Sequence, residues 1–252
     1  MIDSKENKQK ILDNFLKIVS FEGWTKETLI LSFKNSNLDE KLLPIIFEND
    51  IFSLIEFLTK TRCEELKKII DENQNFHSKK THDKISYLIF NLLNLDKNNK
   101  IALKRLFNFY LNLKNFIPTA DFKNNTSFNP LYHGFKELYY VSDFLWNICL
   151  DKSTDFNFYS KRILLAKVLM RSFIFYINDD SENSVKTKSF IDSQITKIIN
   201  FSKIKKLSNE KINFIKNDLH ERLYELNLNS KNPIEILKTL PFFRLIKTNI
   251  FK

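Results

Sequence analysis

The sequence predicts an all-α protein, and three observations lead to this fold class. Only two glycines and five prolines occur in 252 residues, which leaves few of the tight turns that a many-stranded sheet requires. Apolar residues recur with a helical period through most of the chain. Hydrophobic residues make up 43% of the composition, enough to fill a sizeable core. We therefore expect a single domain of about ten helices.

The N-terminal part is expected to hold three short helices. An apolar stripe with a helical period predicts the first helix over residues 5–22, and Gly23 ends it. Thr25 is placed to cap the second helix, which ends at the polar turn 35–37. A third helix follows over residues 39–47.

Longer helices are expected after this part, separated by polar connections at residues 73–83 and 118–130. The predicted helical segments are 51–72, 84–96, 100–114, 133–149, 154–178, 184–202 and 208–226, with a last segment from Pro233. Composition and charge divide the chain into an N-terminal part (1–50), a helical core (51–202) and a basic tail (203–252).

The helix predicted from Asp155 is apolar on nearly all of its surface. One stripe passes through Tyr159 and Met170, and a second face carries Leu165 and Leu169. A helix of this kind is usually buried. It is therefore either the core helix of a bundle or a helix that lines a cavity for an apolar ligand, and both alternatives stay open at this point.

The chain is basic, with a net charge of +10 and a sequence pI near 9.3. A balance of this size favours nucleic acid, an anionic membrane or an acidic protein as a partner. Residues 203–252 carry eleven Lys or Arg against five Asp or Glu, a net of +6. The tail is therefore a candidate contact surface.

Familiar catalytic motifs are missing from the sequence. Two glycines cannot build a Gly-rich phosphate loop, and no G-x-S-x-G turn occurs. None of the four histidines belongs to an H-E-x-x-H pair or follows a Glu by three residues, as zinc and di-iron helices require. They are His77, His82, His133 and His220. We expect no enzyme activity and no metal site.

The two cysteines, Cys63 and Cys149, are far apart, and neither has a second Cys at a metal-ligand or redox spacing. This favours inert thiols in a reducing compartment. No apolar stretch approaches the roughly 20 residues that span a bilayer, and the N-terminus lacks the apolar region of a signal peptide. We expect a cytoplasmic protein that is peripheral to the inner membrane.

The N-terminal helices resemble the helix-turn-helix of tetracycline repressors. The segment Trp24–Ile30 is similar to the second helix of that module, and Phe47 with Asp50–Leu54 is similar to its exit into the fourth helix. Residues 25–50, however, hold three Lys against five acidic residues, a net of −2, whereas a DNA-binding face needs an excess of cations. We expect a degenerate module that binds no nucleic acid. The alternative is a transcriptional regulator that binds DNA.

A second resemblance rests on Gly23–Thr25, Trp146 and above all the run Ser153–Arg162, whose sequence is STDFNFYSKR. It extends into residues 177–192 and covers roughly residues 10–200. This combination resembles the Coq-nine family, whose members are accessory proteins of ubiquinone biosynthesis with a degenerate tetracycline-repressor fold.

The resemblance implies a non-catalytic protein that binds an isoprenoid quinone precursor, or a phospholipid in its place, and presents it to the di-iron demethoxyubiquinone hydroxylase. The residues that it places at or beside the partner-binding patch are Trp146, Asp155, Asn157, Phe158, Tyr159 and Arg162. The expected lipid-binding residues are Leu145, Tyr159, Ile163, Ala166, Met170 and Phe173. The family usually has Trp at the position of Phe158, so this chain keeps the aromatic ring and loses its N–H donor.

The family also ends in an amphipathic helix that binds membrane surfaces, and the tail holds two candidates. The stripe within residues 208–226 is opposed by a face of mixed charge, which suits packing or a homodimer contact. After Pro241, apolar and basic residues lie on different faces, as in an interfacial helix on anionic lipid. The favoured membrane-binding residues are Phe242, Phe243, Arg244, Ile246, Lys247 and Ile250. Alternatively, this segment folds back on its own domain or on a second copy.

Overall fold

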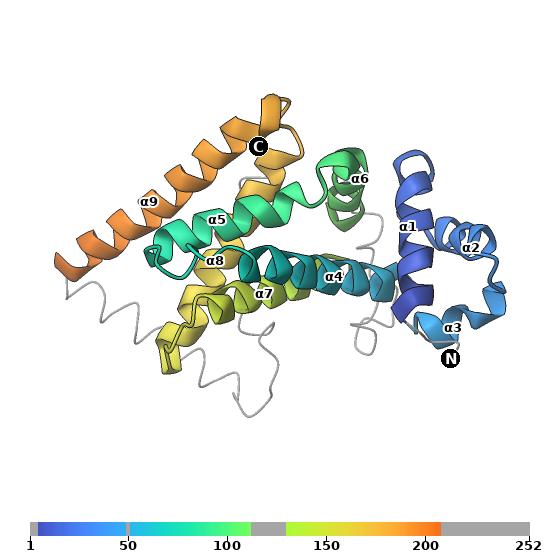
Figure 1. Cartoon of the computed structure of the whole chain (residues 1–252), viewed down its shortest axis with the longest axis horizontal. Coiled ribbons are helices and arrows are strands. Elements are labelled where there is room, and N and C mark those ends of the chain that lie inside the picture. Colours follow the sequence, from blue (N-terminus) through green and yellow to red (C-terminus); the bar gives the residue numbers. More distant parts are fainter. Residues whose placement is uncertain (1–4, 49–50, 112–129, 208–252) are drawn as a thin grey trace, which may run out of the picture. The chain divides into compact units, whose positions relative to one another are not determined.

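The computed structural model describes residues 5–48, 51–111 and 130–207, and all regular elements in these ranges are helices (Figure 1). The all-α fold class predicted from the sequence is therefore confirmed. The α-helices in these ranges are α1 (Lys5–Glu22), α2 (Lys26–Asn35), α3 (Leu43–Ile46), α4 (Ile51–Asp71), α5 (Thr81–Asn94), α6 (Lys100–Leu111), α7 (Pro130–Ile148), α8 (Asp155–Tyr176) and α9 (Val185–Leu207). Short 3₁₀-helices occur at η1 (Glu40–Leu42), η2 (Lys97–Asn99) and η5 (Glu182–Ser184).

The N-terminal helices begin and end where the local sequence signals place them. Gly23 ends α1 with φ of 87°, a left-handed conformation that glycine adopts without a steric penalty. The Thr25 hydroxyl accepts a hydrogen bond from the amide of Thr28 at 3.2 Å and so caps α2. η1 and α3 together occupy the third predicted segment. The likeness to tetracycline repressors stays a prediction.

Several helix boundaries differ from the sequence prediction; α9, for example, continues to Leu207, five residues beyond its predicted end. α7 begins at Pro130, inside the segment predicted to be a loop. Proline has a fixed φ and no N–H, both of which suit the first turn of a helix. α5 begins at Thr81, three residues earlier than predicted. The predicted helices over 208–226 and from Pro233 lie outside the described residues.

The chain divides into two compact units, residues 1–191 and 192–252. In the first unit, one cluster of buried side chains comes from α1, α2, α3, α4 and α6. α7 packs along α8, and α5 also contacts α8 (Figure 1). The described part of the second unit is the helical segment 192–207 within α9. Among the described helices, none combines the length and the hydropathy that crossing a membrane would require.

α8 buries one of its two apolar faces more deeply than the other. The buried face includes Leu165, Val168, Leu169 and Tyr176. The other stripe, which contains Ile163 and Met170, is half-buried. The first face therefore packs as the core helix of a bundle, and the second leaves apolar surface accessible on α8.

Candidate functional site

The site lies where α7 ends and α8 begins. The amide of Asp151 donates to the Trp146 carbonyl at 3.1 Å, and the amide of Leu150 donates to the Asn147 carbonyl at 3.0 Å. These two bonds form a Schellman motif, which ends a helix with one residue in the left-handed conformation. That residue is Leu150, with φ of 59° and a side chain that is 69% exposed. A short connection then leads to α8, whose N-cap is Thr154.

Arg162 is the centre of the site, although only 1% of its surface is exposed. Its Nε donates to a carboxylate oxygen of Asp143 on α7. Its Nη1 donates to the Phe158 carbonyl at 3.1 Å and lies 3.5 Å from Oδ2 of Asp151. A buried guanidinium needs partners of this kind because desolvating an unpaired charge is costly. Arg162 therefore ties both α7 and the connection to the first turn of α8.

The carboxylate of Asp151, in the connection between α7 and α8, lies between the cations of Lys161 and Arg162. It accepts a hydrogen bond from Lys161 Nζ at 2.5 Å and another from the Ser153 hydroxyl. Burial alone would raise the pKa of Asp151, but the hydrogen bonds from Lys161 and Ser153 outweigh it, so the pKa lies below its usual value. The carboxylate is thus held ionised between two cations.

The ring of Phe158 lies against the guanidinium of Arg162. The Arg162 Cζ atom is 3.3 Å from the ring centroid, within the range of a cation–π contact. The ring also meets the edge of Tyr159 at 5.2 Å between centroids and 80° between planes. Arg162 thus fixes the orientation of a half-buried aromatic side chain at the surface.

Two further hydrogen bonds join α7 to α8 at this level. The Ser142 hydroxyl donates to the Arg162 carbonyl at 2.6 Å, and Trp146 Nε1 donates to the Lys161 carbonyl at 3.2 Å. Lys161 Nζ also lies 5.2 Å from the centroid of the Trp146 ring. Because both bonds join a side chain of α7 to the backbone of α8, they hold the two helices in a fixed register.

The structure brings most of the predicted partner-binding residues together but gives them different surroundings. Asn157 is exposed and Tyr159 is 36% exposed, while Phe158 and Trp146 are half-buried. Arg162 is inside. Asp155 begins α8, but its side chain lies outside the described residues.

Several residues of the site were missed by the sequence analysis. Asp143 and Asp151 hold Arg162, and Leu150 is exposed at the same connection. The pair Leu150-Asp151 follows an apolar helix directly, and this position is one where a left-handed residue is common. The sequence signal there is weak because leucine is an unusual choice for that conformation.

The predicted lipid-binding residues differ in how deeply they are buried. Leu145 is fully buried between the helices. The others form a continuous stripe on α8 that is half-buried or more exposed. They are Tyr159, Ile163, Ala166, Met170 and Phe173. The side chain of Phe173 meets Phe107 of α6 at 6.3 Å between ring centroids. The stripe is therefore a surface on which an apolar chain could lie.

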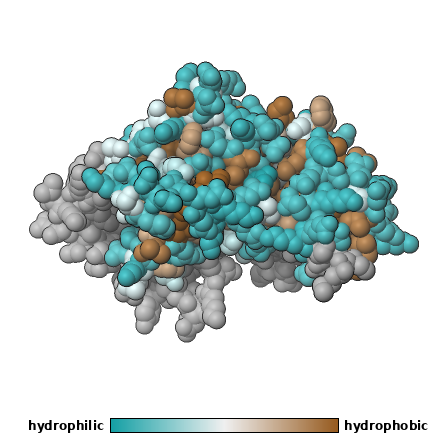
Figure 2. All heavy atoms as spheres, in the orientation of Figure 1, coloured by the Kyte–Doolittle hydropathy of each residue, from teal (hydrophilic) through white to brown (hydrophobic). Residues whose placement is uncertain are grey.

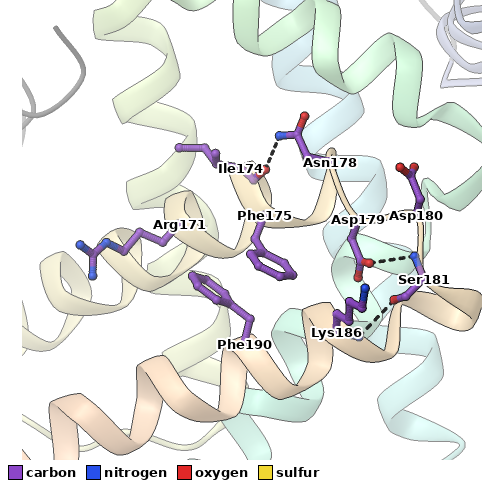
Figure 3. Close-up of a pocket in the computed structure, with 9 residues that line it drawn as sticks. All are labelled: Arg171, Ile174, Phe175, Asn178, Asp179, Asp180, Ser181, Lys186 and Phe190. Carbon is purple, nitrogen blue, oxygen red and sulfur yellow. Dashed lines mark hydrogen bonds between the residues drawn. The ribbon is translucent and has the colours of Figure 1, made fainter. Parts of the chain in front are cut away.

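A separate cavity of about 640 Å³ lies at the corner between α8 and α9 (Figure 3). Its lining residues are Arg171, Ile174, Phe175, Asn178, Asp179, Asp180, Ser181, Lys186 and Phe190. Figure 3 shows the rings of Phe175 and Phe190 facing each other, with centroids 4.4 Å apart and planes at 10°. This volume is within the range of small-molecule sites, and none of the predicted lipid-binding residues lines it.

The remaining predictions concern the membrane-binding residues, metal binding and the two cysteines. The membrane-binding residues proposed between Phe242 and Ile250 lie outside the described residues. Within the described ranges, no group of three or more His, Cys, Asp or Glu side chains is arranged to hold a metal ion. Burial raises the pKa of the Cys63 thiol to about 12 and that of Cys149 to about 11, so both cysteines stay protonated and unreactive at neutral pH.

The α7–α8 pair of this all-α protein thus holds a buried charge cluster, the Arg162 clamp, which consists of Arg162, Asp143 and Asp151. It lies beneath the aromatic side chains of Phe158 and Tyr159. One family model is similar to this part of the chain. Residues 131–202, which contain α8 and most of α7 and α9, match the COQ9 family model. The family resemblance predicted from the sequence is therefore confirmed.

A curated relative agrees with this match. The chain is 26% identical over 203 residues to a Dictyostelium discoideum protein named "Probable ubiquinone biosynthesis protein coq9, mitochondrial". The similarity covers 79% of this chain and 62% of the relative. This chain therefore matches less than two thirds of the length of that relative.

Proposed function

We propose that this protein is a non-catalytic accessory protein of ubiquinone biosynthesis. In this role it binds an isoprenoid quinone precursor, or a phospholipid, and presents it to the di-iron demethoxyubiquinone hydroxylase at a membrane surface. The observation that carries the proposal is the position of the Arg162 clamp, because it lies inside the segment 131–202 that matches the COQ9 family model.

The partner-docking surface consists of Leu150, Asn157, Phe158 and Tyr159. Aromatic and apolar side chains at a protein surface are frequent anchors of protein–protein contacts. Arg162 acts beneath this surface as a positioning residue, since its guanidinium is buried and its contacts hold the Phe158 ring. A side chain whose orientation is fixed in advance loses less entropy on binding.

The lipid lies along the accessible stripe of α8, with the ring of Tyr159 at one end and Phe173 at the other. Its apolar chain covers side chains that the bundle leaves half-buried. The tail from residue 233 supplies the contact with the membrane, which keeps the protein peripheral to it. Hydroxylation is carried out by the partner enzyme, so no catalytic residue is assigned to this chain.

Partner capture tests the docking surface. Asn157→Lys changes an exposed residue beside Phe158 and leaves the Arg162 contacts in place, so it should weaken capture of the purified hydroxylase at least tenfold without altering thermal stability. Tyr140→Lys is the matched control, because Tyr140 is an exposed aromatic on α7 outside the docking surface. Equal capture by both variants would remove the docking surface from the proposal.

Mass spectrometry of lipid that co-purifies with the protein tests the lipid site. Met170→Gln keeps the volume of a half-buried side chain and places a polar group on the stripe, so it should lower the amount of bound lipid. Phe175→Gln places a polar group in the corner cavity and removes the ring stacked on Phe190, and it should leave the lipid content unchanged. Loss of lipid from Phe175→Gln alone would assign the ligand to the corner cavity.

A further inference from the structure

Two large hydrophobic side chains are strongly exposed, one at the C-terminal end of α1 and one at the start of α6. Among the other large hydrophobic residues in the described part of unit 1–191, only Leu150 is more exposed than the second of them. Phe21 is 80% exposed and Ile101 is 63% exposed. In Figure 2, hydrophobic groups gather at the upper edge over α6 and the end of α1, with hydrophilic surface around them. Neither residue contributes to the α7–α8 site.

One hydrogen bond and one close approach place these helix ends side by side. Trp24 Nε1 donates to the carbonyl of Ala102, which follows Ile101, at 2.9 Å. A methyl group built on Gly23 would lie 3.6 Å from Nη1 of Arg105, so the Arg105 guanidinium is beside the end of α1 that carries Phe21. The C-terminal end of α1 and the first turns of α6 are therefore neighbours, with the buried Trp24 between them.

Cations accompany both hydrophobic side chains on their own helix faces. Lys17 precedes Phe21 by four residues, and Lys104 and Arg105 follow Ile101 by three and four residues. Residues at these spacings lie on the same side of a helix. All three cations are exposed, and Glu22 is an exposed acid beside them. The surface thus has three positive charges against one negative charge around two apolar side chains.

We propose that this surface, defined by Lys17, Phe21, Ile101, Lys104 and Arg105, is a second membrane contact that binds anionic lipid headgroups and inserts Phe21 and Ile101 at the interface. Apolar side chains that enter the headgroup region, flanked by cations that attract anionic lipid, are the recognised chemistry of interfacial binding. The contact depends neither on the basic tail nor on the docking surface. A bilayer fits better than a protein pocket because the apolar side chains project from helix ends among cations.

Tryptophan fluorescence of the full chain tests the contact at the residue itself. Phe21→Trp places a reporter on the surface, and its emission should shift to shorter wavelength with vesicles of phosphatidylcholine and phosphatidylserine but not with phosphatidylcholine alone. Ile45→Trp is the matched control, because Ile45 is 56% exposed on α3 and has no place in the proposed surface. Its emission should not change with either vesicle.

The vesicle affinity of serine variants gives an independent measure. Phe21→Ser combined with Ile101→Ser should weaken binding about a hundredfold, since each buried side chain of this size contributes roughly a factor of ten. Ile45→Ser should bind as the unchanged chain does. The proposal is overturned if the emission of the Phe21→Trp variant stays constant while the protein sediments with anionic vesicles, or if no vesicle binding occurs. A shift that grows with protein concentration without vesicles would instead assign the surface to a second copy.

Discussion

The two ends of α8 are both held by a buried charged residue, but in different ways. At the start, Arg162 is balanced by the carboxylates of Asp143 and Asp151. At the end, the carboxylate of Asp179 accepts hydrogen bonds from the Ser181 amide at 2.9 Å, from the Thr187 amide at 2.8 Å and from the Thr187 hydroxyl at 2.6 Å. The first end uses opposite charges, and the second uses neutral donors.

This difference separates the proposed docking surface from a helix corner. The Asp179 contacts reach from residue 179 to residue 187 and turn the chain from α8 into α9. The contacts of Arg162 reach α7 and leave Asn157, Phe158 and Tyr159 accessible above it. We infer that the end of α8 is fixed for the fold alone, whereas its start is fixed so that side chains are presented to a partner.

Removal of the guanidinium should have the largest effect on stability. Arg162→Ala empties a buried position and removes one cation from the buried Asp151, which keeps Lys161, and from Asp143, whose side chain is 37% exposed. The loss should therefore be about 2–4 kcal/mol, below the upper end for a broken buried pair. Urea unfolding followed by circular dichroism measures the loss. Lys60→Ala removes a surface pair with Glu56 and should cost less than about 1 kcal/mol. A similar small loss for Arg162→Ala would mean that the clamp does not hold the site.

The corner at Asp179 should give a smaller loss that depends on pH. Asp179→Asn should cost about 1–3 kcal/mol at neutral pH, because amides of Thr187 and Ser181 lose a charged acceptor. Asp180→Asn, at an exposed neighbour, is the control.

The pH dependence follows from the pKa of Asp179. Burial raises this pKa, but the hydrogen bonds from Thr187 and Ser181 outweigh burial and hold it well below its usual value. A carboxyl whose pKa is lowered by folding stabilises the protein above its unfolded pKa, which is about 3.9, and this stability is lost as pH falls further. The difference between wild type and Asp179→Asn should therefore shrink below about pH 4. A difference that stayed constant to about pH 2 would contradict the assignment.

Phe158→Leu should affect binding more than folding. The variant keeps an apolar side chain over Arg162 and removes the cation–π contact, which is worth about 0.5–2 kcal/mol. Capture of the hydroxylase should fall further than this stability change accounts for. Phe158→Trp restores an N–H donor on the ring and should capture the hydroxylase at least as well as the original chain. Weaker capture by Phe158→Trp would show that the pocket on the partner is fitted to a phenyl ring.

The sequence predicts the helices well, because apolar periodicity, the Thr25 cap and Gly23 are local signals. The family resemblance of the sequence also predicts that Trp146 and Asn157–Tyr159 belong to one site. The role of Arg162 could not be predicted, since its burial depends on Asp143, nineteen residues earlier, and on Asp151 in a connection with no helical pattern. A basic residue in an exposed-looking helix turn gives no sign that two carboxylates enclose it. The same limit applies to Leu150, whose conformation is set by how α7 ends.

Substitutions of Leu150, just before α8, should change stability least among these variants and should act mainly on capture of the hydroxylase. An L-residue other than glycine pays roughly 1–2 kcal/mol in the left-handed conformation, and glycine recovers part of this while adding entropy to the unfolded chain. Leu150→Gly should therefore raise stability by about 0.5–1 kcal/mol. Because the variant also removes an exposed apolar side chain from the docking surface, capture of the hydroxylase should fall at the same time. Leu150→Ala keeps the backbone conformation and loses the side chain, so it should lower capture without the gain in stability. If Leu150→Gly stabilised the protein and left capture unchanged, the exposed leucine would be only a strained helix end, and docking would rest on the turn Asn157–Tyr159.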